Sequence, residues 1–162
     1  MKSETIIHPI PPVFDGNSEI LILGSFPSVK SREYGFFYGH PQNRFWRVVA
    51  AVCGEETPVS IDEKKRMLLR NGIAVWDVIH SCKITGSADS SIKNAVPNDI
   101  AGIIGKSRIN RIFTNGRKAD ELYRKYLEKQ TGIKATCLPS TSPANAARSL
   151  AQLTEEWSVI LK

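Results

Sequence analysis

The sequence predicts an α/β protein, a three-layer α/β/α sandwich with a central four-stranded parallel sheet. Short apolar runs bounded by Gly, Asn-Gly or Pro alternate along the chain with segments whose apolar residues recur at helical spacing. Strands separated by helices need right-handed crossovers, which make the strands parallel and cover both faces of the sheet. The length of 162 residues fits one domain over 1–162, because division would leave two marginal cores.

The predicted strands are the apolar runs 19–24, 73–78, 109–114 and 134–138. Amphipathic spacing predicts helices over 43–52, 62–69, 99–104, 117–129 and 144–153, the last opened by Pro143. The Gly- and Ser-containing stretch 85–91 is expected to be a functional loop. In sheets of this kind the working site lies at the carboxyl ends of the strands. The segments that follow Gly24, Asp77, Asn115 and Leu138 are therefore where functional residues are expected.

Composition narrows the function classes. Lys and Arg number 22 against 16 Asp and Glu, and the net charge of +6 favours an anionic partner, nucleic acid first. No apolar run approaches the roughly 20 residues that cross a bilayer, and the N-terminal segment lacks a signal-peptide core, so a cytoplasmic protein without membrane contact is expected. The three cysteines and three histidines are far apart and lack metal-ligand spacing, so no metal site is predicted.

The first informative motif follows the first strand. Gly24-Ser25-Phe26-Pro27-Ser28 turns the backbone out at the edge of the sheet, and 34–46 carries Phe36, Phe37 and Tyr38 in a row. Exposing so many aromatics is unfavourable, so either a flat partner such as a base stacks there or the rings form a satellite core under the loop. Asn43 stands directly before an apolar-periodic segment, where Asn is a common helix N-cap.

The second motif, 138–148, leads from the last strand into the last predicted helix. It is small, polar and stiffened by Pro139 and Pro143. Such a loop at a helix N-terminus can hold a phosphate or enter a groove of DNA. An ordinary connection capped by Ser142 or Asn145 is the alternative.

Together the two motifs resemble motifs one and two of the uracil-DNA glycosylase superfamily. The resemblance is carried by 23–28 and by Gly-Phe-Phe-Tyr-Gly-His-Pro-Gln-Asn-Arg-Phe-Trp over 35–46, with further similarity at 11–14 and 72–78. It is closest to the hypoxanthine-DNA glycosylase branch, also called family six or DNA-deoxyinosine glycosylase. Mismatch-specific uracil and thymine glycosylases share the part from His40 to Trp46.

The resemblance implies an enzyme without a cofactor that flips a damaged nucleotide out of DNA and cuts its N-glycosidic bond. Most members place Asp or Asn at the third position of Gly-x-x-Pro, where this chain has Phe26. Asn43 is then the candidate catalytic residue, its side-chain carbonyl positioning a water. The motif-two position that is His in the common uracil-removing branch is Leu138 here. Both departures argue against efficient uracil excision and fit a branch specialised in deaminated purines.

The resemblance also implies a base-binding set. Tyr38 aligns with the ring that stacks on the flipped base, Phe36 and Phe37 are expected pocket walls, and the amides of Ser25 and Phe26 are expected to bind a base carbonyl. Asp77 matches the position that reads the base edge: a carboxylate there accepts the N1–H of hypoxanthine, whereas adenine presents a lone pair. A helix cap or a salt bridge is the alternative role of Asp77. The expected DNA contacts are Ser28, Ser90, Ser91, Ser140, Thr141, Ser142, Pro143, Asn145 and Arg148, the 140–145 loop acting as the wedge.

The expected function is therefore that of a monofunctional, monomeric glycosylase that excises hypoxanthine from DNA in base excision repair. Monofunctional chemistry is expected because no lysine near the site lies in an apolar segment that would activate it for Schiff-base formation. Two alternatives stay open: a mismatch-specific uracil or thymine glycosylase, and a non-catalytic reader of damaged DNA. The non-catalytic alternative stays open because of Phe26, which replaces the Asp or Asn that most members have at this position.

Overall fold

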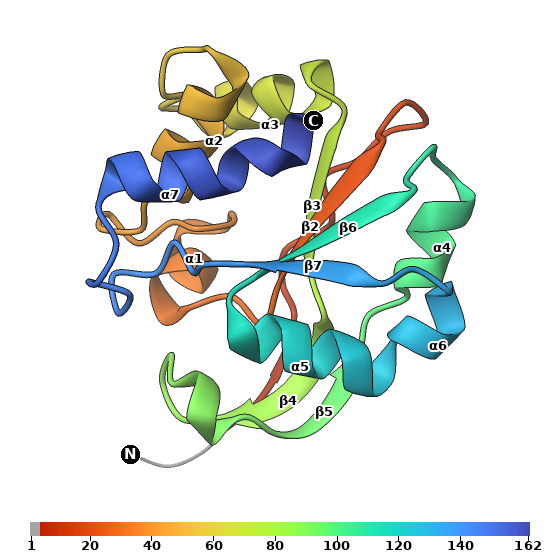
Figure 1. Cartoon of the computed structure of the whole chain (residues 1–162). Coiled ribbons are helices and arrows are strands. Elements are labelled where there is room, and N and C mark those ends of the chain that lie inside the picture. The colour runs from red at the N-terminus through yellow and green to blue at the C-terminus, as the bar shows by residue number, and fades with distance from the viewer. Residues whose placement is uncertain (1–3) are drawn as a thin grey trace.

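A parallel sheet forms the centre of the protein, whose computed structural model describes residues 4–162. Its strands lie in the order β3-β2-β6-β7 (Figure 1). Their bounds are Ile20–Gly24 for β2, Ile73–Asp77 for β3, Arg111–Asn115 for β6 and Ala135–Leu138 for β7. All three pairings are parallel. The predicted four-stranded sheet is confirmed.

Alternate side chains of the strands enter two separate cores, because successive residues of a strand point to opposite faces. Ile22 of β2 and Val75 of β3 belong to one core. Leu21 of β2 and Ala74 of β3 belong to the other. Both faces are buried, which explains why these strands read as continuous apolar runs.

Helices cover each face. On one side lie α2 (Phe45–Cys53), α3 (Ile61–Arg70) and α7 (Leu150–Trp157), and on the other lie α4 (Ile100–Gly105), α5 (Arg117–Tyr126) and α6 (Glu128–Thr131) (Figure 1). The expected three-layer sandwich is confirmed. Within residues 4–162, no helix has the length and apolar character that crossing a membrane requires.

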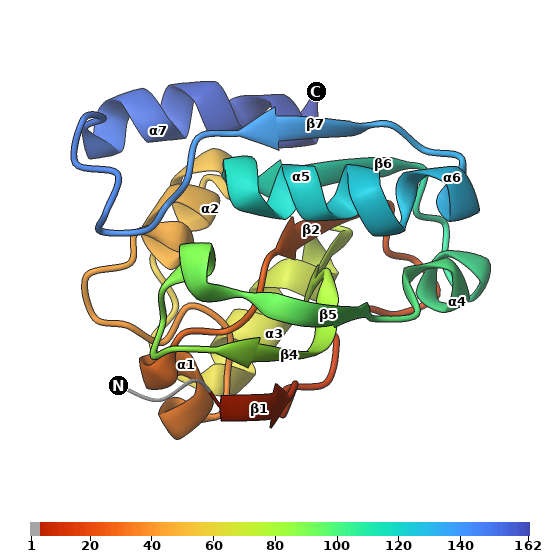
Figure 2. The ribbon, with the colours of Figure 1, turned by 90° about the horizontal axis from the view of Figure 1, so that it is seen from below.

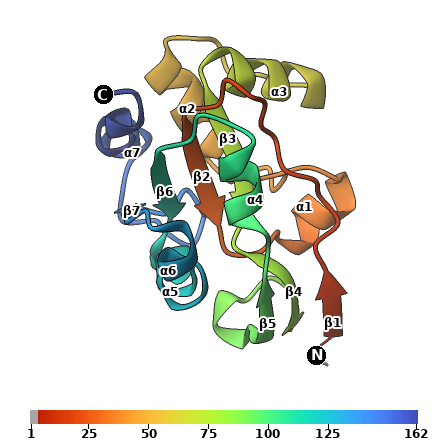
Figure 3. The same cartoon turned by 90° about the vertical axis from the view of Figure 1, so that its right-hand side faces the viewer.

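A second, antiparallel sheet was not predicted. It contains β1 (Glu4–Ile7), β4 (Ile79–Ile84) and β5 (Lys93–Pro97) in the order β1-β4-β5 (Figures 2 and 3). The sequence signal for these strands was weak. Buried and exposed residues are mixed in β4, and β5 is largely exposed, so neither strand is a continuous apolar run. The 85–91 loop connects these two strands and contains one short 3₁₀ turn, η1 (Asp89–Ser91).

Three helix predictions need correction. The expected helix over 144–153 begins only at Leu150, after a capping box at Ser149. The Ser149 hydroxyl accepts from the backbone N–H of Gln152, and the backbone N–H of Ser149 donates to the side-chain oxygen of Gln152. The expected 117–129 helix is broken at Leu127 between α5 and α6. Helix α1 (Val29–Tyr34) was missed, and it is capped by Ser28. A final 3₁₀ turn, η2, spans Ser158–Leu161.

Candidate functional site

A cavity of about 430 Å³ lies at the carboxyl edge of the parallel sheet, a volume typical of small-molecule sites. All four strand ends reach it: Gly24 ends β2, Asp77 ends β3, Asn115 ends β6 and Ser140 follows β7. The segment before α2 and the 85–91 loop supply further walls. The expected location of functional residues thus coincides with a cavity that the structure contains.

Asn43 lines this cavity, and its amide has a fixed orientation. Its Oδ1 accepts a hydrogen bond from the backbone N–H of Phe45 at 2.9 Å and from the hydroxyl of Thr141 at 2.8 Å. Because a backbone N–H can only donate, the oxygen must occupy this end of the amide. The N-cap residue of α2 is Arg44, without a side-chain cap hydrogen bond, so the N-cap interpretation of Asn43 is wrong, although Asn43 accepts the N–H of the first helical residue. Among residues 4–162 the amide nitrogen of Asn43 makes no hydrogen bond, so the nitrogen is the free end.

Thr141 connects Asn43 to the end of β6. The Thr141 amide donates to Oδ1 of Asn115 at 3.0 Å, and Nδ2 of Asn115 donates to the Thr141 hydroxyl at 3.0 Å. The hydroxyl must then donate to Asn43. Thr141 was predicted as a DNA contact, but its side chain is fully buried, so its role is to hold Asn43 in place.

Arg44 fixes the segment after β7 against the start of α2. Its guanidinium donates to the backbone carbonyls of Arg148 at 2.6 Å and Asn145 at 2.8 Å, and its backbone N–H donates to the Thr141 carbonyl at 3.1 Å. The segments before α2 and after β7 run side by side at the left of Figure 1. The two motifs found in the sequence are therefore bound together directly.

Tyr38 lines the cavity from the left-handed region of the backbone map, at φ 53°. Its ring stacks on Phe45, with centroids 4.0 Å apart and planes 17° apart. Its hydroxyl is buried and has no hydrogen-bond partner within residues 4–162. Burial, and next the nearby Asp77 carboxyl, raise the pKa of this hydroxyl, so it remains a hydrogen-bond donor.

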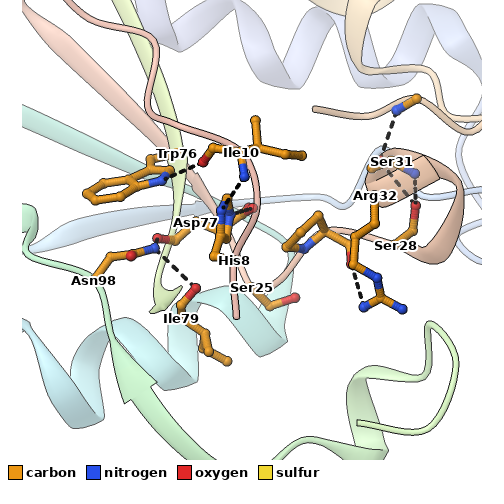
Figure 4. A network of polar contacts seen from close by, with 12 residues as sticks. His8, Ile10, Ser25, Ser28, Ser31, Arg32, Trp76, Asp77, Ile79 and Asn98 are labelled. Carbon is orange, nitrogen blue, oxygen red and sulfur yellow. Dashed lines mark hydrogen bonds and ion pairs between the residues drawn. The ribbon is translucent and has the colours of Figure 1, made fainter. Parts of the chain in front are cut away.

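Asp77 ends β3 beneath the same cavity and is buried. Its Oδ2 lies 2.7 Å from Nε2 of His8 (Figure 4). A Cβ atom at Gly24 would lie 2.4 Å from Asp77 Oδ1 and 3.0 Å from the Tyr38 hydroxyl. Only glycine fits at position 24, because these two polar groups converge on it.

Asp89 reaches the cavity from the 85–91 loop. Its Oδ1 accepts a hydrogen bond from the Ser25 hydroxyl at 2.8 Å. Burial raises the pKa of this carboxyl, which the Ser25 hydrogen bond and then Lys118 partly offset. The backbone N–H of Val29 donates to the Ser87 hydroxyl at 2.8 Å, which holds the loop against the start of α1.

Of the two predicted aromatic walls, Phe37 lines the cavity. Phe26, which was predicted only through its backbone amide, lines it too. Phe36 does not: it is 2% exposed and stacks on Trp46, with centroids 5.8 Å apart and planes 14° apart. Phe36 is a core residue, as the alternative interpretation expected in part, but it belongs to the main core that contains Ile22 and Val75 and not to a satellite core.

The predicted DNA contacts also divide. Those that line the cavity are Ser28, Ser140, Thr141, Ser142 and Pro143; those that do not are Ser90, Ser91, Asn145 and Arg148. The Ser91 hydroxyl donates a hydrogen bond to the Ala88 carbonyl, and the side-chain NH₂ of Asn145 donates one to the Ser140 carbonyl. Arg148 is paired with Glu156. The side chains of Ser91 and Asn145 hold their loops in shape, and Arg148 pairs with the last long helix.

Sequence reasoning missed His8, Asp89 and Asn115 as parts of the site. Asn115 carried a usable signal, since it directly follows the predicted strand 109–114. Asp89 lies in the 85–91 stretch that was expected to be a functional loop, but nothing singled out its side chain. His8 carried no signal, because it comes to the site from the antiparallel sheet. Among residues 4–162, no group of three or more His, Cys, Asp or Glu side chains is placed to hold a metal ion.

Comparison with known proteins decides the family. The family model of the uracil DNA glycosylase superfamily matches residues 11–160. The chain belongs to this superfamily. The match spans both motifs and every strand of the parallel sheet.

Curated members of the superfamily are similar over nearly the whole chain. A protein named hypoxanthine DNA glycosylase from Methanosarcina acetivorans is 40% identical over 156 residues, covering 94% of this chain and 96% of the relative. A protein of the same name from Methanosarcina barkeri is 37% identical over 155 residues, with 94% and 96% covered. The solution NMR structure of a candidate uracil DNA glycosylase from Methanosarcina acetivorans has a TM-score of 0.82 and 37% identity, and it covers 96% of this chain and 97% of that one.

Two departures from the superfamily pattern have structural explanations. Phe26 stands where most members have Asp or Asn, and it packs edge-on against His8 with centroids 5.8 Å apart. Leu138 stands where the common uracil-removing branch has His, and it is buried in the core rather than lining the cavity. Neither position presents a polar side chain to the site, so its chemistry must come from other residues.

Proposed function

We propose that this protein hydrolyses the N-glycosidic bond of hypoxanthine in DNA. The observation that carries the proposal is the meeting of Asn43, Tyr38 and the turn after Leu138 in one cavity. The relatives named hypoxanthine DNA glycosylase support the choice of base. The apolar replacements at Phe26 and Leu138 support it too, because they remove the groups with which other branches act on uracil.

The reaction makes modest demands on the protein. The bond between C1′ of the deoxyribose and N9 of the base breaks, and its electron pair leaves with the base. The sugar passes through an oxocarbenium-like state, and a water oxygen bonds to C1′ while its proton passes to the departing base or to solvent. An electron-poor C1′ needs a placed water more than a strong base. The products are free hypoxanthine and an abasic site in an unbroken strand.

Asn43 is the residue proposed to place this water. Its oxygen already accepts two hydrogen bonds, so the expectation that the side-chain carbonyl positions the water needs correction. The NH₂ group is the end proposed to donate to the water oxygen. The second lone pair of that oxygen stays free to attack C1′. The chain from Asn115 through Thr141 to Asn43 fixes the direction in which the NH₂ group points.

Asp77 is proposed to select the base. An oxygen of its carboxyl accepts the N1–H of hypoxanthine, and it meets a lone pair when adenine enters. A site that binds an N–H discriminates strongly against an analogue without that N–H. The buried acceptor, here the Asp77 carboxyl, would then be left without a hydrogen-bond partner.

A panel of oligonucleotides tests the proposed function. The purified protein is incubated, with chelator present, with strands that carry hypoxanthine, uracil, xanthine or a G·T mismatch, and released bases are separated by chromatography. We expect release of free hypoxanthine, with the strand intact until alkali is added. Release of uracil or thymine alone would identify a mismatch glycosylase. Salt-dependent binding of the strands without release of any base would identify a non-catalytic protein that binds damaged DNA.

A further inference from the structure

His8 lies buried beside the proposed base-reading carboxyl, although it is distant in sequence. It follows β1, and its backbone N–H donates to the His80 carbonyl at 2.6 Å. Its side chain is 2% exposed. Three rings surround it, with centroids 5.8, 6.1 and 6.3 Å away: Phe26, Phe37 and Trp76. This packing allows the imidazole little freedom.

The hydrogen bonds of His8 define its tautomer. The backbone N–H of Ile10 donates to Nδ1 of His8 at 3.2 Å, so Nδ1 carries no proton (Figure 4). Nε2 then carries the ring proton and donates it to Oδ2 of Asp77 at 2.7 Å. Ile10 is itself held, since its carbonyl accepts from the Trp76 indole at 3.3 Å. The ring is thus a neutral, single donor aimed at one carboxyl oxygen.

The other oxygen of Asp77 is free for a ligand. Oδ1 lies against Gly24 and has no hydrogen-bond partner within residues 4–162, and Asp77 lines the cavity. Nδ2 of Asn98 donates to the Asp77 backbone carbonyl at 2.9 Å and to that of Ile79 at 3.1 Å, which fixes the end of β3 (Figure 4). The carboxyl is therefore held at its backbone and at one oxygen.

We propose that His8 is a positioning residue for base selection: it holds Oδ2 of Asp77, so that Oδ1 faces the cavity as a fixed acceptor for the ring N–H of a lactam base. The inference rests on the proposed function and adds to it the residue that sets the direction of the acceptor. The substrate class is that of bases with a C(=O)–NH edge, as deamination of adenine produces.

The choice of histidine has a chemical reason. An arginine at this place would engage both carboxyl oxygens in a bidentate pair and leave no acceptor for a base. A neutral imidazole with one N–H engages a single oxygen. Within residues 4–162, His8 is the only side chain paired with the Asp77 carboxyl, so the other oxygen keeps its capacity to accept.

Two substitutions separate positioning from packing. His8→Gln keeps a donor near the place of Nε2, and His8→Leu keeps the bulk but removes the donor. We expect His8→Leu to slow single-turnover release of hypoxanthine by about tenfold to a hundredfold, and His8→Gln to restore most of the rate. An oligonucleotide carrying unsubstituted purine, which lacks both the carbonyl and the N–H, should be affected little by either substitution. His80→Leu, an exposed histidine on β4, is the matched control and should leave both rates unchanged.

A double-mutant cycle with Asp77→Asn decides whether His8 acts through Asp77. If it does, His8→Leu adds no further loss once Asp77 is replaced. Three results would overturn the proposal. The first is a loss of rate in the double variant equal to the product of the two single losses. The others are an equal loss of rate on the purine substrate and an unchanged rate in His8→Leu. Thermal unfolding of each variant verifies that it is folded under the assay conditions.

Binding supplies a readout that does not need excision. Strands carrying 2′-fluorinated deoxyinosine resist cleavage, because the fluorine disfavours the oxocarbenium state. Wild type should bind them more tightly than matched deoxyadenosine strands, and His8→Leu should reduce this discrimination. Equal discrimination in both proteins would overturn the role of His8. Absence of excision by wild type would contradict the proposed function alone, while the binding comparison would still decide the role of His8.

Discussion

At the scale of single residues, the site depends on polar side chains that are hydrogen-bonded at one end and free to bind a ligand at the other. Asn43 has a fixed oxygen and a free NH₂ group. Asp77 has one oxygen held by His8 and the other against Gly24. The resemblance to the uracil-DNA glycosylase superfamily predicted Asn43 and Asp77 as site residues. The sequence could not predict which end of each side chain is free, because that depends on contacts with Thr141 and His8, which come from distant segments.

The Tyr38 hydroxyl is a buried donor without a partner, and such a group costs about 1–3 kcal/mol. We therefore expect Tyr38→Phe to raise the free energy of unfolding by about 1 kcal/mol, measured by urea denaturation. Hypoxanthine excision should fall in the same variant if the hydroxyl serves the bound base. Tyr34→Phe, on an exposed ring, should change stability by less than about 0.5 kcal/mol. A loss of stability in Tyr38→Phe would show that the hydroxyl has a partner.

At the scale of elements, the site is assembled by loops that are attached to one another. Arg44 attaches the segment after β7 to the start of α2, and Ser25 attaches the 85–91 loop to the end of β2. The helix predicted over 144–153 was wrong in its first half for this reason. Tertiary hydrogen bonds from Arg44 hold 145 and 148 in a non-helical path, and local spacing cannot report them.

Replacing Arg44 tests this attachment. Arg44→Met keeps the aliphatic stem but removes two hydrogen bonds to backbone carbonyls, so we expect stability to fall by about 1–3 kcal/mol. Limited proteolysis should cut the segment 140–149 faster, and excision should slow. Arg47→Met, at an exposed position in the next turn of α2, is the control. Equal proteolysis of both variants would contradict the attachment.

The 85–91 loop should show a pH-dependent stability. The raised pKa of Asp89 means that the folded protein binds this proton more tightly than the unfolded chain does. Stability therefore falls as pH rises from the unfolded-state pKa, about 3.9, through the folded-state pKa, and the penalty is complete above it. Asp89→Asn keeps an acceptor for Ser25 and removes the penalty.

We expect Asp89→Asn to have a higher melting temperature than wild type at neutral pH, and the difference should shrink as pH falls through the raised pKa of Asp89 and be lost below about 4. Differential scanning calorimetry across this range measures the effect. Asp62→Asn, an exposed carboxylate on α3, should show no such trend. A melting-temperature difference that grows toward acid would contradict the burial of Asp89.

At the scale of the whole molecule, the parallel sheet was predictable and the antiparallel sheet was not. Strands buried on both faces must be apolar throughout, so β2, β3, β6 and β7 are visible in the sequence. The strands β4 and β5 cover one edge of the molecule and mix exposed with buried residues. Asp89 lines the cavity from this part of the fold, and His8 lies behind the cavity against Asp77, which is why the sequence did not place either side chain at the site.

The net charge of +6 bears on how the whole molecule meets DNA. If a few phosphates are neutralised on binding, the dissociation constant for duplex DNA should rise by about tenfold or more between about 50 mM and about 200 mM salt. Fluorescence anisotropy of a labelled duplex measures this change. Affinity that does not depend on salt would contradict phosphate contacts.

The most direct test of the central claim compares wild type with Asn43→Ala in single-turnover release of hypoxanthine from a deoxyinosine oligonucleotide. Loss of the two hydrogen bonds that Asn43 accepts should cost about 1–3 kcal/mol of stability, so both proteins are assayed well below the melting temperature of the variant. We expect the rate of base release to fall by about a hundredfold or more, with DNA binding retained. An Asn43→Ala protein that is folded and releases hypoxanthine at the wild-type rate would contradict the account.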